Sequence, residues 1–424
     1  MIYKLHDIYQ AGHSVETDSR KVVPGVMFFA LKGEHFDGNA YAARALEAGA
    51  VCAVVDDPKV AVDNRYYVVR DVLQALQAMA RLHRRTLEIP VLAITGSNGK
   101  TTTKELVSRV LAKRFNVSTT KGNLNNHIGV PLTLLSIAPG TEFAVVEMGA
   151  NHRGEIASYC AVAEPDYGLI TNIGKAHLEG FGGETGIRKG KGELFDYLAR
   201  TDGTAFYLSE SEDLSEMAAE RPGLTAYGFS SSVLDVLPAE NSLLTLRYAH
   251  RPIHTQLIGD YNRYNVAAAL AIGEYFEIDT AEAIEAIGSY VPENNRSQRT
   301  ITGRNTLYMD AYNANPSSMS AALDHFAGVE EPDCEKALIL GDMRELGDYA
   351  EAEHRAILDK IRSHGFSRVY LTGPVFGSVG NGEYPTFPTA TELAEFLREF
   401  PIQKCVVLIK GSRGIRLEEI IPLL

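Results

Sequence analysis

The order of apolar and polar residues predicts short buried strands that alternate with amphipathic helices through the middle of the chain. The strands expected there are apolar runs that end in glycine-rich or polar segments: residues 90–95, 141–149 and 166–174. After the first run, apolar residues recur at helical spacing over residues 106–111. Apolar strands separated by helices are typical of a largely parallel sheet that helices cover on both faces.

Similar patterns flank this central part on both sides. Before residue 85 we expect strands at 25–33 and 51–57, a helix at 39–50 and a long connecting helix at 71–87. From residue 296 onward we expect an amphipathic helix at 349–365 and four strands, at 306–312, 336–343, 367–373 and 404–411. The predicted fold class is therefore α/β, with a small N-terminal domain (1–85), a central parallel-sheet domain (86–295) and a C-terminal Rossmann-like domain (296–424).

Composition narrows the class of protein without naming a function. The 424 residues are too many for one core, and 45% hydrophobic with 22% charged residues is ordinary for a soluble protein. A net charge of −13 argues against a general nucleic-acid binder. The four cysteines lack metal-ligand or redox spacing: Cys52, Cys160, Cys334 and Cys405. The N-terminus lacks a basic start before an apolar run, and no segment approaches the length of about 20 apolar residues that spans a membrane, so we expect a cytoplasmic protein without membrane insertion. We also expect a monomer.

A glycine-rich loop joins the strand at 90–95 to the helix that follows it. Residues 93–107 read AITGSNGKTTTKELV. A glycine turn at a helix N-terminus points backbone N–H groups outward, where the helix dipole favours negative charge. Lys100 would reach the terminal phosphates of a nucleotide, and Thr101 would ligate Mg²⁺. Only two residues separate Gly96 from Gly99, so this is a shortened relative of the P-loop. The alternative is a polar turn before a threonine-rich helix.

Two further polar residues follow neighbouring apolar runs. Glu147 ends the run at 141–149, and His177 lies in the loop after the run at 166–174. Ligands of such sheets bind beyond the carboxyl ends of the strands, where a carboxylate can hold Mg²⁺. We therefore expect ligand roles for both residues. The alternatives are an exposed strand-end glutamate and a structural histidine.

Lys191 stands out because its position conflicts with its charge. Ile187, Lys191, Leu194 and Leu198 share one face of a helical pattern, whereas Lys189 points elsewhere. A buried lysine is costly unless it is paired, modified or deprotonated. The alternative is a lysine whose apolar stem is buried and whose amine reaches water. Periodicity alone does not distinguish these fates.

Several segments together resemble the Mur ligases, the ATP-dependent enzymes that form amide bonds in peptidoglycan synthesis. The central domain of that family is matched by TGSNGKTTTKE, GNLNNHIGVPLTLL, VVEMGANHRGEI, NIGKAHLEGFG and KGKGELF. TDSRKVVPGVMFFALKGEHFDGNAY resembles its UDP-binding N-terminal domain, and DAYNANPSSMSAAL, LGDMRELGDYAEAEHR and VLIKGSRG resemble its C-terminal domain. YNANP together with GDMRELG resembles the branch that adds D-alanyl-D-alanine to UDP-N-acetylmuramoyl-tripeptide.

This resemblance implies a reaction and a set of site residues. The tripeptide carboxylate would attack the γ-phosphate of ATP, and the amine of D-alanyl-D-alanine would attack the resulting acyl phosphate, with two Mg²⁺ ions stabilising charge. The implied catalytic residues are Lys100, Glu147, His177 and Lys191. Thr101 and Glu147 would bind the first Mg²⁺. His177 and Lys191 would bind the second, Lys191 as a carbamate formed with CO₂.

The resemblance also implies residues for ATP and for the precursor. The implied ATP-binding residues are Thr95, Gly96, Ser97, Asn98, Gly99, Lys100, Thr101, Thr102, Asn262, Asn265, Arg296, Asp310, Asn313 and Asn315. The implied substrate-binding residues are Asp18, Ser19, Arg20, Asn125 and Asn126. The chain departs from the family at Tyr261, where histidine is usual, and at Met309, where a second aspartate is frequent.

Three other functions compete with this interpretation. Folylpolyglutamate synthase shares the glycine loop and the modified lysine, but TDSRKVVPG and YNANP argue against it. A Mur ligase that adds a single amino acid is disfavoured by GDMRELG. A non-catalytic ATP-dependent scaffold or switch is disfavoured by the complete set of Lys100, Thr101, Glu147, His177 and Lys191.

Overall fold

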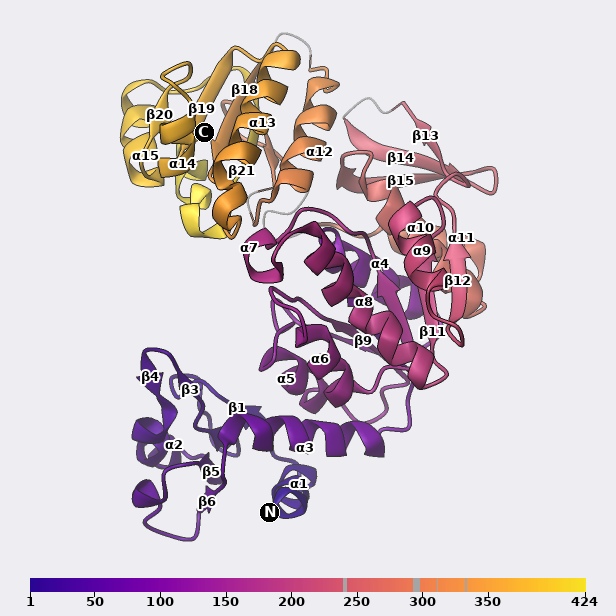
Figure 1. Ribbon diagram of the computed structural model, residues 1–424, viewed down its shortest axis with the longest axis vertical. Helices are drawn as coiled ribbons and strands as arrows, with labels where there is room; N and C mark the ends of the chain where they lie inside the picture. The colour runs from indigo at the N-terminus through magenta and orange to yellow at the C-terminus, as the bar shows by residue number, and fades with distance from the viewer. Residues whose placement is uncertain (239–241, 293–297, 311, 332–333) are drawn as a thin grey trace.

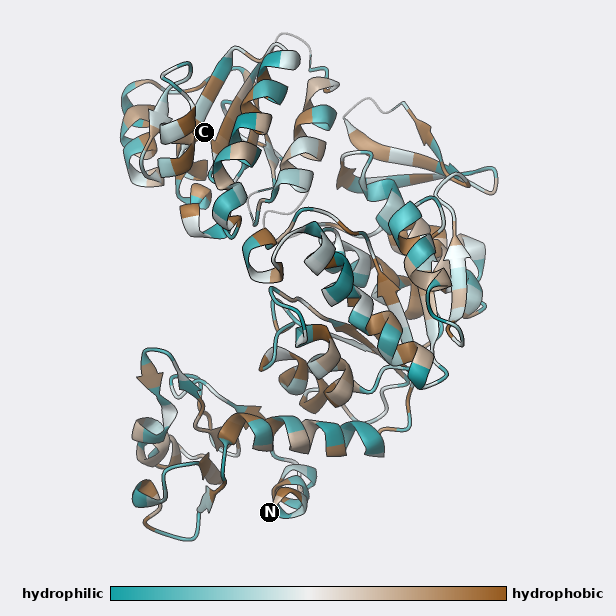
Figure 2. Ribbon diagram, viewed as in Figure 1, coloured by the Kyte–Doolittle hydropathy of each residue, from teal (hydrophilic) through white to brown (hydrophobic). Residues whose placement is uncertain are grey.

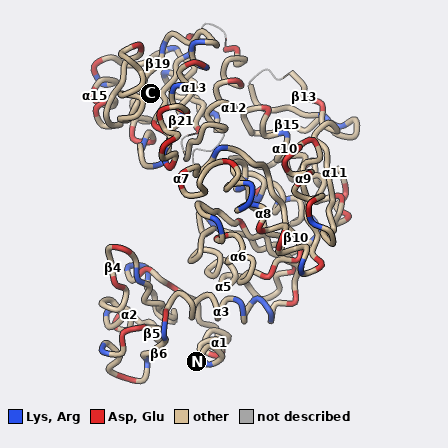
Figure 3. The backbone as a smooth tube through the Cα atoms, in the orientation of Figure 1, with Lys and Arg blue, Asp and Glu red and all other residues tan. Residues whose placement is uncertain are grey.

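The computed structural model describes residues 1–238, 242–292, 298–310, 312–331 and 334–424. Three domains follow one another along the chain, from the indigo N-terminal domain through the magenta central domain to the orange and yellow C-terminal domain (Figure 1). Apolar residues concentrate on the strands and on the helix faces that cover them (Figure 2). Acidic and basic positions are both present on each domain (Figure 3). Within the described ranges, no helix is long and apolar enough to cross a membrane.

The N-terminal domain is a small parallel sheet with a hairpin and three helices. The sheet has the order β1 (Val15–Glu16), β2 (Met27–Phe29), β5 (Cys52–Val55), β6 (Tyr66–Val68), and the hairpin pairs β3 (Lys32–Gly33) with β4 (Phe36–Asp37). The helices are α1 (Ile2–Gln10), α2 (Ala42–Glu47) and α3 (Val72–Thr86). The expected elements are confirmed, although β2 and α2 are shorter than the apolar runs that predict them.

Helix α3 is the connecting helix that the sequence predicts. The Asp71 side chain accepts a hydrogen bond from the backbone N–H of Gln74, which caps its first turn. Leu76 and Met79 on its apolar face are fully buried. The helix packs against α1 and against α5 (Gly129–Leu135) and α6 (Glu155–Ala163) of the central domain, so it joins the two domains (Figure 1).

The central domain is a six-stranded sheet in which every pair of neighbouring strands is parallel. Its order is β12 (Thr225–Phe229), β11 (Thr204–Leu208), β10 (Tyr167–Ile170), β7 (Val91–Thr95), β9 (Phe143–Glu147), β8 (Val117–Thr119). Alternate residues of β7 enter different cores. Val91 and Ala93 pack on the side of α5, α6 and α8 (Glu184–Arg200), whereas Leu92 and Ile94 pack on the side of α4 (Lys100–Leu111) and α10 (Asn262–Tyr275). The predicted sheet with two covered faces is confirmed.

The remaining central elements lie around this sheet. The further helices are α7 (Leu178–Phe181), α9 (Glu212–Ala219) and α11 (Thr280–Gly288). An antiparallel sheet of β13 (Asp235–Leu237), β14 (Leu243–Tyr248) and β15 (Arg251–Ile258) packs beside α11. The apolar runs do not predict this small sheet.

The C-terminal domain, which we call the lid, is a second six-stranded sheet. Its order is β16 (Gln298–Ile301), β17 (Thr306–Met309), β21 (Cys405–Lys410), β18 (Glu335–Gly341), β19 (Arg368–Thr372), β20 (Thr386–Phe387), and only β16 is antiparallel to its neighbour. The lid helices are α12 (Pro316–Ala327), α13 (Ala350–Ser363), α14 (Pro374–Val379) and α15 (Ala390–Glu399). The four predicted strands and the helix at 349–365 are confirmed.

Candidate functional site

The glycine loop between β7 and α4 has a backbone that side chains would block. Gly96 has φ +140° and Gly99 has φ +78°, a region that L-residues rarely adopt. A Cβ atom on Gly96 would lie 2.0 Å from Thr171 Oγ1, and one on Gly99 would lie 2.5 Å from Asn265 Oδ1. Both positions therefore require glycine.

The loop is fastened to the segment that follows β10. Ser97 Oγ donates to the Gly174 carbonyl oxygen (2.8 Å) and accepts from the Gly174 N–H (2.9 Å). The Asn98 N–H donates to Asn172 Oδ1 at 3.0 Å. The Ser97 hydroxyl thus holds the loop in shape.

Two threonines beside the loop are buried. Thr95 Oγ1 donates to the Met148 carbonyl oxygen at 2.7 Å, which ties the end of β7 to the end of β9. Thr102 is 8% exposed in the first turn of α4. Both residues belong to the framework of the loop.

Helix α4 begins with the two residues to which the sequence assigns phosphate and metal binding. Lys100 Nζ donates to the carbonyl oxygens of Gly96 (2.7 Å) and Ser97 (3.2 Å). Thr101 Oγ1 donates to Glu147 Oε1 at 3.2 Å. The ammonium group therefore lies over the glycine loop, and the hydroxyl contacts the carboxylate that ends the neighbouring strand.

Glu147 is a buried carboxylate with one unsatisfied oxygen. It is the last residue of β9 and is 1% exposed. Its Oε1 also accepts from Asn125 Nδ2 at 2.7 Å, while Oε2 is buried without a hydrogen-bond partner among the described residues. A buried anionic oxygen without a partner is unfavourable unless a cation or donor approaches it. Hard oxygen donors of this kind suit Mg²⁺.

Lys191 is buried in α8, as its helical spacing predicts. The residue is 1% exposed, whereas Lys189 is exposed. Its Nζ lies 3.3 Å from the Ala150 carbonyl oxygen and 5.1 Å from the centre of the Phe181 ring. Burial, with a smaller contribution from the charge of Lys100, holds the pKa of this amine well below its ordinary value. Burial thus makes the neutral form of this amine more accessible than in an exposed lysine.

His177 joins the central domain to the lid. It precedes α7, has φ +56°, and its side chain is 19% exposed. Its Nδ1 contacts the carboxylate of Glu345 in the lid. This hydrogen bond holds the pKa of Glu345 below its usual value.

Two predicted residues of the lid, Asp310 and Asn313, contact a buried lysine. Lys410, at the end of β21, is 1% exposed and pairs with Asp310. Its Nζ also lies 3.4 Å from the Asn313 carbonyl oxygen. The ion pair therefore fixes the segment that carries Asp310 and Asn313. Asn315 Nδ2 donates to Asn98 Oδ1 of the glycine loop at 2.7 Å.

Asn262 and Asn265 support the glycine loop from the first turn of α10. Asn265 Nδ2 donates to Asn262 Oδ1 at 2.7 Å, and Asn265 Oδ1 accepts from Thr103 Oγ1 at 3.0 Å. Asn262 Nδ2 donates to the Ile258 carbonyl oxygen at 2.7 Å. Both residues line the central cleft, and their role toward adenine stays a prediction.

Most of these residues line one cleft of about 800 Å³ between the central domain and the lid, whereas Thr95, Gly96 and Lys191 do not line it. Of the predicted residues, it is lined by Ser97, Asn98, Gly99, Lys100, Thr101, Thr102, Asn125, Asn126, Glu147, His177, Asn262, Asn265, Asp310, Asn313 and Asn315. Asn126 Oδ1 accepts from the N–H groups of Ile128 (3.1 Å) and Gly129 (2.9 Å) at the start of α5. Arg296 lies outside the described residues.

The predicted UDP-binding residues lie in a turn of the N-terminal domain after β1. Arg20 forms a two-point ion pair with Asp18, with Nε–Oδ1 at 2.9 Å and Nη2–Oδ2 at 2.8 Å. The hydrogen bonds from Arg20 lower the pKa of Asp18 to about 2. Ser19 is half-buried in the same turn. Their role in binding stays a prediction.

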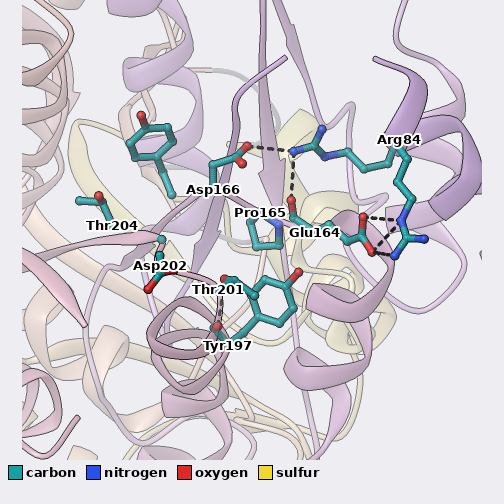
Figure 4. A pocket seen from close by; sticks show the side chains of 11 residues that line it. Arg84, Glu164, Pro165, Asp166, Tyr197, Thr201, Asp202 and Thr204 are labelled. Atoms are coloured by element: carbon teal, nitrogen blue, oxygen red, sulfur yellow. Dashed lines mark hydrogen bonds and ion pairs between the residues drawn. The ribbon is translucent and has the colours of Figure 1, made fainter. Parts of the chain in front are cut away.

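A second cavity, of about 440 Å³, lies at the opposite end of the central strands. Figure 4 shows that its arginines pair with Glu164 and Asp166, while Asp202 lies apart from these pairs. Arg84 Nη2 donates to Asp166 Oδ2 at 2.9 Å, and Arg85 Nη2 donates to Glu164 Oε1 at 2.6 Å. These pairs connect α3 to the central domain, which gives the arginines, Glu164 and Asp166 a structural role.

Three residues in or beside the cleft were not predicted from the sequence: Glu345 and Lys410, which line it, and Lys175, which precedes His177 by two positions. Lys410 carries the same signal as Lys191, because it is a lysine within an otherwise apolar segment, CVVLIK. Lys175 and Glu345 carry no local signal. Their partners, Glu353 and His177, belong to the other domain in each case.

Comparison with known proteins agrees with this architecture. Three family models match in chain order: "Mur ligase family, catalytic domain" at residues 12–84, "Mur ligase middle domain" at 94–273, and "Mur ligase, glutamate ligase domain" at 295–413. A Bacillus subtilis protein named UDP-N-acetylmuramoyl-tripeptide–D-alanyl-D-alanine ligase is 35% identical, over 96% of this chain and 92% of the relative.

Solved structures are similar over the whole chain. MurF from Acinetobacter baumannii superposes with a TM-score of 0.86 at 28% identity, covering 96% of this chain and 92% of the other. MurF ligase from Thermotoga maritima, in complex with ADP, gives a TM-score of 0.85 at 26% identity, covering 98% and 97%. The chain belongs to the Mur ligase family.

Proposed function

We propose that this chain is an ATP-dependent, ADP-forming ligase that joins D-alanyl-D-alanine to UDP-N-acetylmuramoyl-tripeptide in peptidoglycan precursor synthesis. The name of the Bacillus subtilis relative supports this substrate pair. The structural observation that carries the proposal is the meeting of Lys100, Thr101 and Glu147 at the carboxyl ends of β7 and β9. Asn98 of the same loop accepts a hydrogen bond from Asn315 of the lid, so the proposed nucleotide site would include residues of both domains.

The ATP triphosphate would lie on the glycine loop. Backbone N–H groups at the start of α4 would receive phosphate oxygens. Lys100 would exchange its contacts with the loop carbonyls for the γ-phosphate, which offers a full negative charge in their place. Asn262 and Asn265 would border the adenine, and Asp310, Asn313 and Asn315 would border the ribose and phosphates from the lid.

The reaction would proceed in two steps. An oxygen of the terminal tripeptide carboxylate forms a bond to the γ-phosphorus of ATP, the bond to the β-phosphate bridging oxygen breaks, and ADP leaves. The amine of D-alanyl-D-alanine then attacks the acyl carbon, loses a proton, and expels inorganic phosphate from the tetrahedral intermediate. Lys100 would offset negative charge during the first transfer, and lid contact would exclude water that could hydrolyse the acyl phosphate.

Mg²⁺ fits the residues present. Within the described ranges there is no cluster of three or more histidine, cysteine or acidic side chains. The unsatisfied Oε2 of Glu147 beside the Thr101 hydroxyl nevertheless offers the sparse oxygen set that Mg²⁺ accepts together with substrate phosphates. Thr101 and Glu147 would hold one ion, and His177 and Lys191 a second. When bound, the ions would neutralise charge between triphosphate and carboxylate.

Lys191 would serve as a carbamate. Burial shifts the amine toward its neutral form by lowering its pKa, and only a neutral amine attacks CO₂. The nitrogen forms a bond to the CO₂ carbon and loses one proton, which converts a base into an anionic oxygen ligand. The carbamate would also place a negative charge near the positive charge of Lys100, which disfavours an ammonium at this position.

The remaining proposals concern the residues that bind the precursor, the domain boundaries, the cellular location and the oligomeric state. Asp18, Ser19 and Arg20 would contact the UDP moiety, and Asn125 and Asn126 would lie near the incoming substrate. The chain would divide at residues 85/86 and 295/296 into precursor-binding, ATP-binding and lid domains. We propose that it acts as a cytoplasmic monomer.

Phosphate release from ATP with purified protein and Mg²⁺ tests the proposal. UDP-N-acetylmuramoyl-tripeptide is supplied with D-alanyl-D-alanine, with D-alanine alone, or is replaced by tetrahydrofolate and glutamate. We expect release only with the UDP-tripeptide and the dipeptide together, and a UDP-pentapeptide product by mass spectrometry.

The other outcomes identify the alternatives. Release with D-alanine alone would indicate a ligase that adds a single residue. Release only with folate and glutamate would indicate a folylpolyglutamate synthase. Tight ATP binding without release under any condition would indicate a nucleotide-dependent switch.

A further inference from the structure

The loop that carries His177 is held by the lid at several points. This loop comprises residues 174–177 between β10 and α7. Within the central domain its backbone is held by Ser97, which bonds Gly174, and by the Phe181 N–H, which donates to the His177 carbonyl oxygen. From the lid, Ser317 Oγ accepts from the Lys175 N–H at 2.9 Å, and Glu353 pairs with Lys175 Nζ at 2.7 Å. The His177 ring contacts Glu345 of the lid, so the orientation of the imidazole depends on that contact.

Glu345 contacts this region through both its backbone and its side chain. Its carbonyl oxygen accepts from the N–H of Glu179 in α7 at 3.2 Å, while its carboxylate contacts His177 Nδ1. Glu345 and His177 both have left-handed backbones, with φ +62° and φ +56°. Non-glycine residues keep such conformations only where the surrounding structure fixes them.

The contact dictates which imidazole nitrogen carries the proton. An ionised carboxylate only accepts hydrogen bonds, so Nδ1 of His177 must be the donor. In neutral imidazole the other nitrogen, Nε2, then carries the lone pair that a metal ion uses. Metal-ligating histidines commonly donate their second nitrogen to a carboxylate, which fixes ring orientation and tautomer.

We propose that Glu345 is a positioning residue of the lid that holds His177 in its Nδ1–H tautomer, so that the second divalent-cation site is complete only when the lid is docked. The proposal rests on the proposed function, since it concerns the second ion that His177 and Lys191 would hold. It gives the lid a direct chemical link to the central domain's metal site. Binding of the second ion and docking of the lid would then favour each other.

The test compares Glu345→Ala, Glu345→Gln and Glu353→Gln in the full-length chain. Glu353→Gln is the matched control, because it weakens a contact between the same lid and the same loop without touching His177. Mn²⁺ binding is followed by electron paramagnetic resonance with a saturating non-hydrolysable ATP analogue. The tautomer of His177 is read by nitrogen-15 NMR of histidine-labelled protein without metal or nucleotide, with His177→Asn to assign its signal.

We expect two Mn²⁺ ions in the wild type, and a second ion that binds about 10- to 100-fold more weakly in Glu345→Ala. Glu345→Gln, whose amide oxygen still accepts a hydrogen bond, should lose less affinity. Glu353→Gln should remain close to the wild type. The NMR signal of His177 should report the Nδ1–H tautomer in the wild type and lose it in Glu345→Ala.

Three results would overturn the proposal. They are a single Mn²⁺ site in the wild type, equal loss of the second ion in Glu345→Ala and Glu353→Gln, and an unchanged His177 tautomer in Glu345→Ala. A different result would refute the proposed function without refuting this role of Glu345. A wild type that makes no UDP-pentapeptide but binds its second Mn²⁺ in a Glu345-dependent manner would refute only the assigned reaction.

Discussion

Asn315 at the start of α12 donates a 2.7 Å hydrogen bond from Nδ2 to Asn98 Oδ1 in the glycine loop. These two residues lie 217 positions apart, in different domains. Asn315 also caps α12, because its Oδ1 accepts from the N–H of Ser318 at 2.9 Å. One side chain thus caps the N-terminus of the lid helix α12 and contacts the loop that would bind phosphate.

This contact predicts coupling between lid and loop. Asn98→Ala removes only the bond between domains, whereas Asn315→Ala also removes a helix cap that is worth about 1 kcal/mol. We expect kcat/KM for ATP to fall about 10-fold in Asn98→Ala, and the lid to lose thermal stability only in Asn315→Ala. A double-mutant cycle on kcat/KM should give a coupling of about 1 kcal/mol. Additive effects of the two substitutions would contradict the functional link.

The carboxylate of Glu147 provides a second prediction. Glu147→Gln keeps the shape and the acceptor for Thr101 but removes the anionic charge beside the unsatisfied Oε2 position. We expect ligase activity to fall about 100-fold or more, and the Mg²⁺ concentration for half-maximal rate to rise. The fold should remain intact in thermal melts, because a buried unpaired charge is removed.

Glu142→Gln is the matched control for this change. Glu142 precedes the same strand, β9, at its opposite end, and its Oε2 accepts from the Asn116 N–H at 2.8 Å on the surface. We expect wild-type activity and Mg²⁺ dependence in Glu142→Gln. Equal effects of the two substitutions would argue that Glu147 acts through the strand and not through a cation.

Lys191 provides a third prediction. Lys191→Ala should abolish activity because it removes the buried amine that would form the carbamate, an amine that burial shifts toward its neutral form. Lys189→Ala, on the exposed face of α8, should keep the activity. A short carboxylate such as acetate or propionate should restore part of the activity of Lys191→Ala by supplying the missing oxygen ligand. Carbon-13 NMR with labelled bicarbonate should show a carbamate signal that Lys191→Ala lacks. Wild-type activity without carbon dioxide would contradict the modification.

The sequence predicts those parts of the fold whose physical signal is local. Continuous apolar runs predict β7, β9 and β10 because parallel strands with two covered faces bury every side chain. The sheet of β13, β14 and β15 has one covered face, and Ile253, Thr255 and Leu257 are buried at alternate positions of β15. A search for continuous runs overlooks such strands, although the alternation itself is a signal.

The residues of the candidate site also fall into those with a local sequence signal and those without one. Lys191 is recognisable because its spacing places a charge on an apolar helix face, and the glycine loop because its backbone needs glycine. The pairing of His177 with Glu345 joins residues 168 positions apart and depends on how two domains dock. The sequence contains both residues, but periodicity and spacing act within one element and carry no information about docking.

The junction of α1 and α3 provides a last prediction, on stability. His83 is 8% exposed and its Nε2 lies 3.4 Å from Tyr9 Oη, while Tyr9 Oη donates to the Leu135 carbonyl oxygen at 2.7 Å. Nε2 therefore carries the proton, and Nδ1 is buried without a partner among the described residues. Burial, with a smaller contribution from His6 at a ring distance of 5.8 Å, lowers the pKa of His83 from 6.5 to about 4.

Because the pKa of His83 is lower in the folded chain than in the unfolded chain, the unfolded chain binds a proton first as the pH falls. The free energy of unfolding is therefore highest above pH 6.5 and decreases as the pH falls from 6.5 toward 4. The loss amounts to about 3 kcal/mol, since one pKa unit corresponds to about 1.4 kcal/mol. His83→Leu should therefore lose less stability than the wild type over this range, when unfolding is followed by calorimetry. His250→Leu, at an exposed position, should follow the wild type. If wild type and His83→Leu lose stability in parallel, the His83 imidazole is not the group that titrates, and the acid sensitivity comes from another group, such as His6, whose pKa burial also lowers.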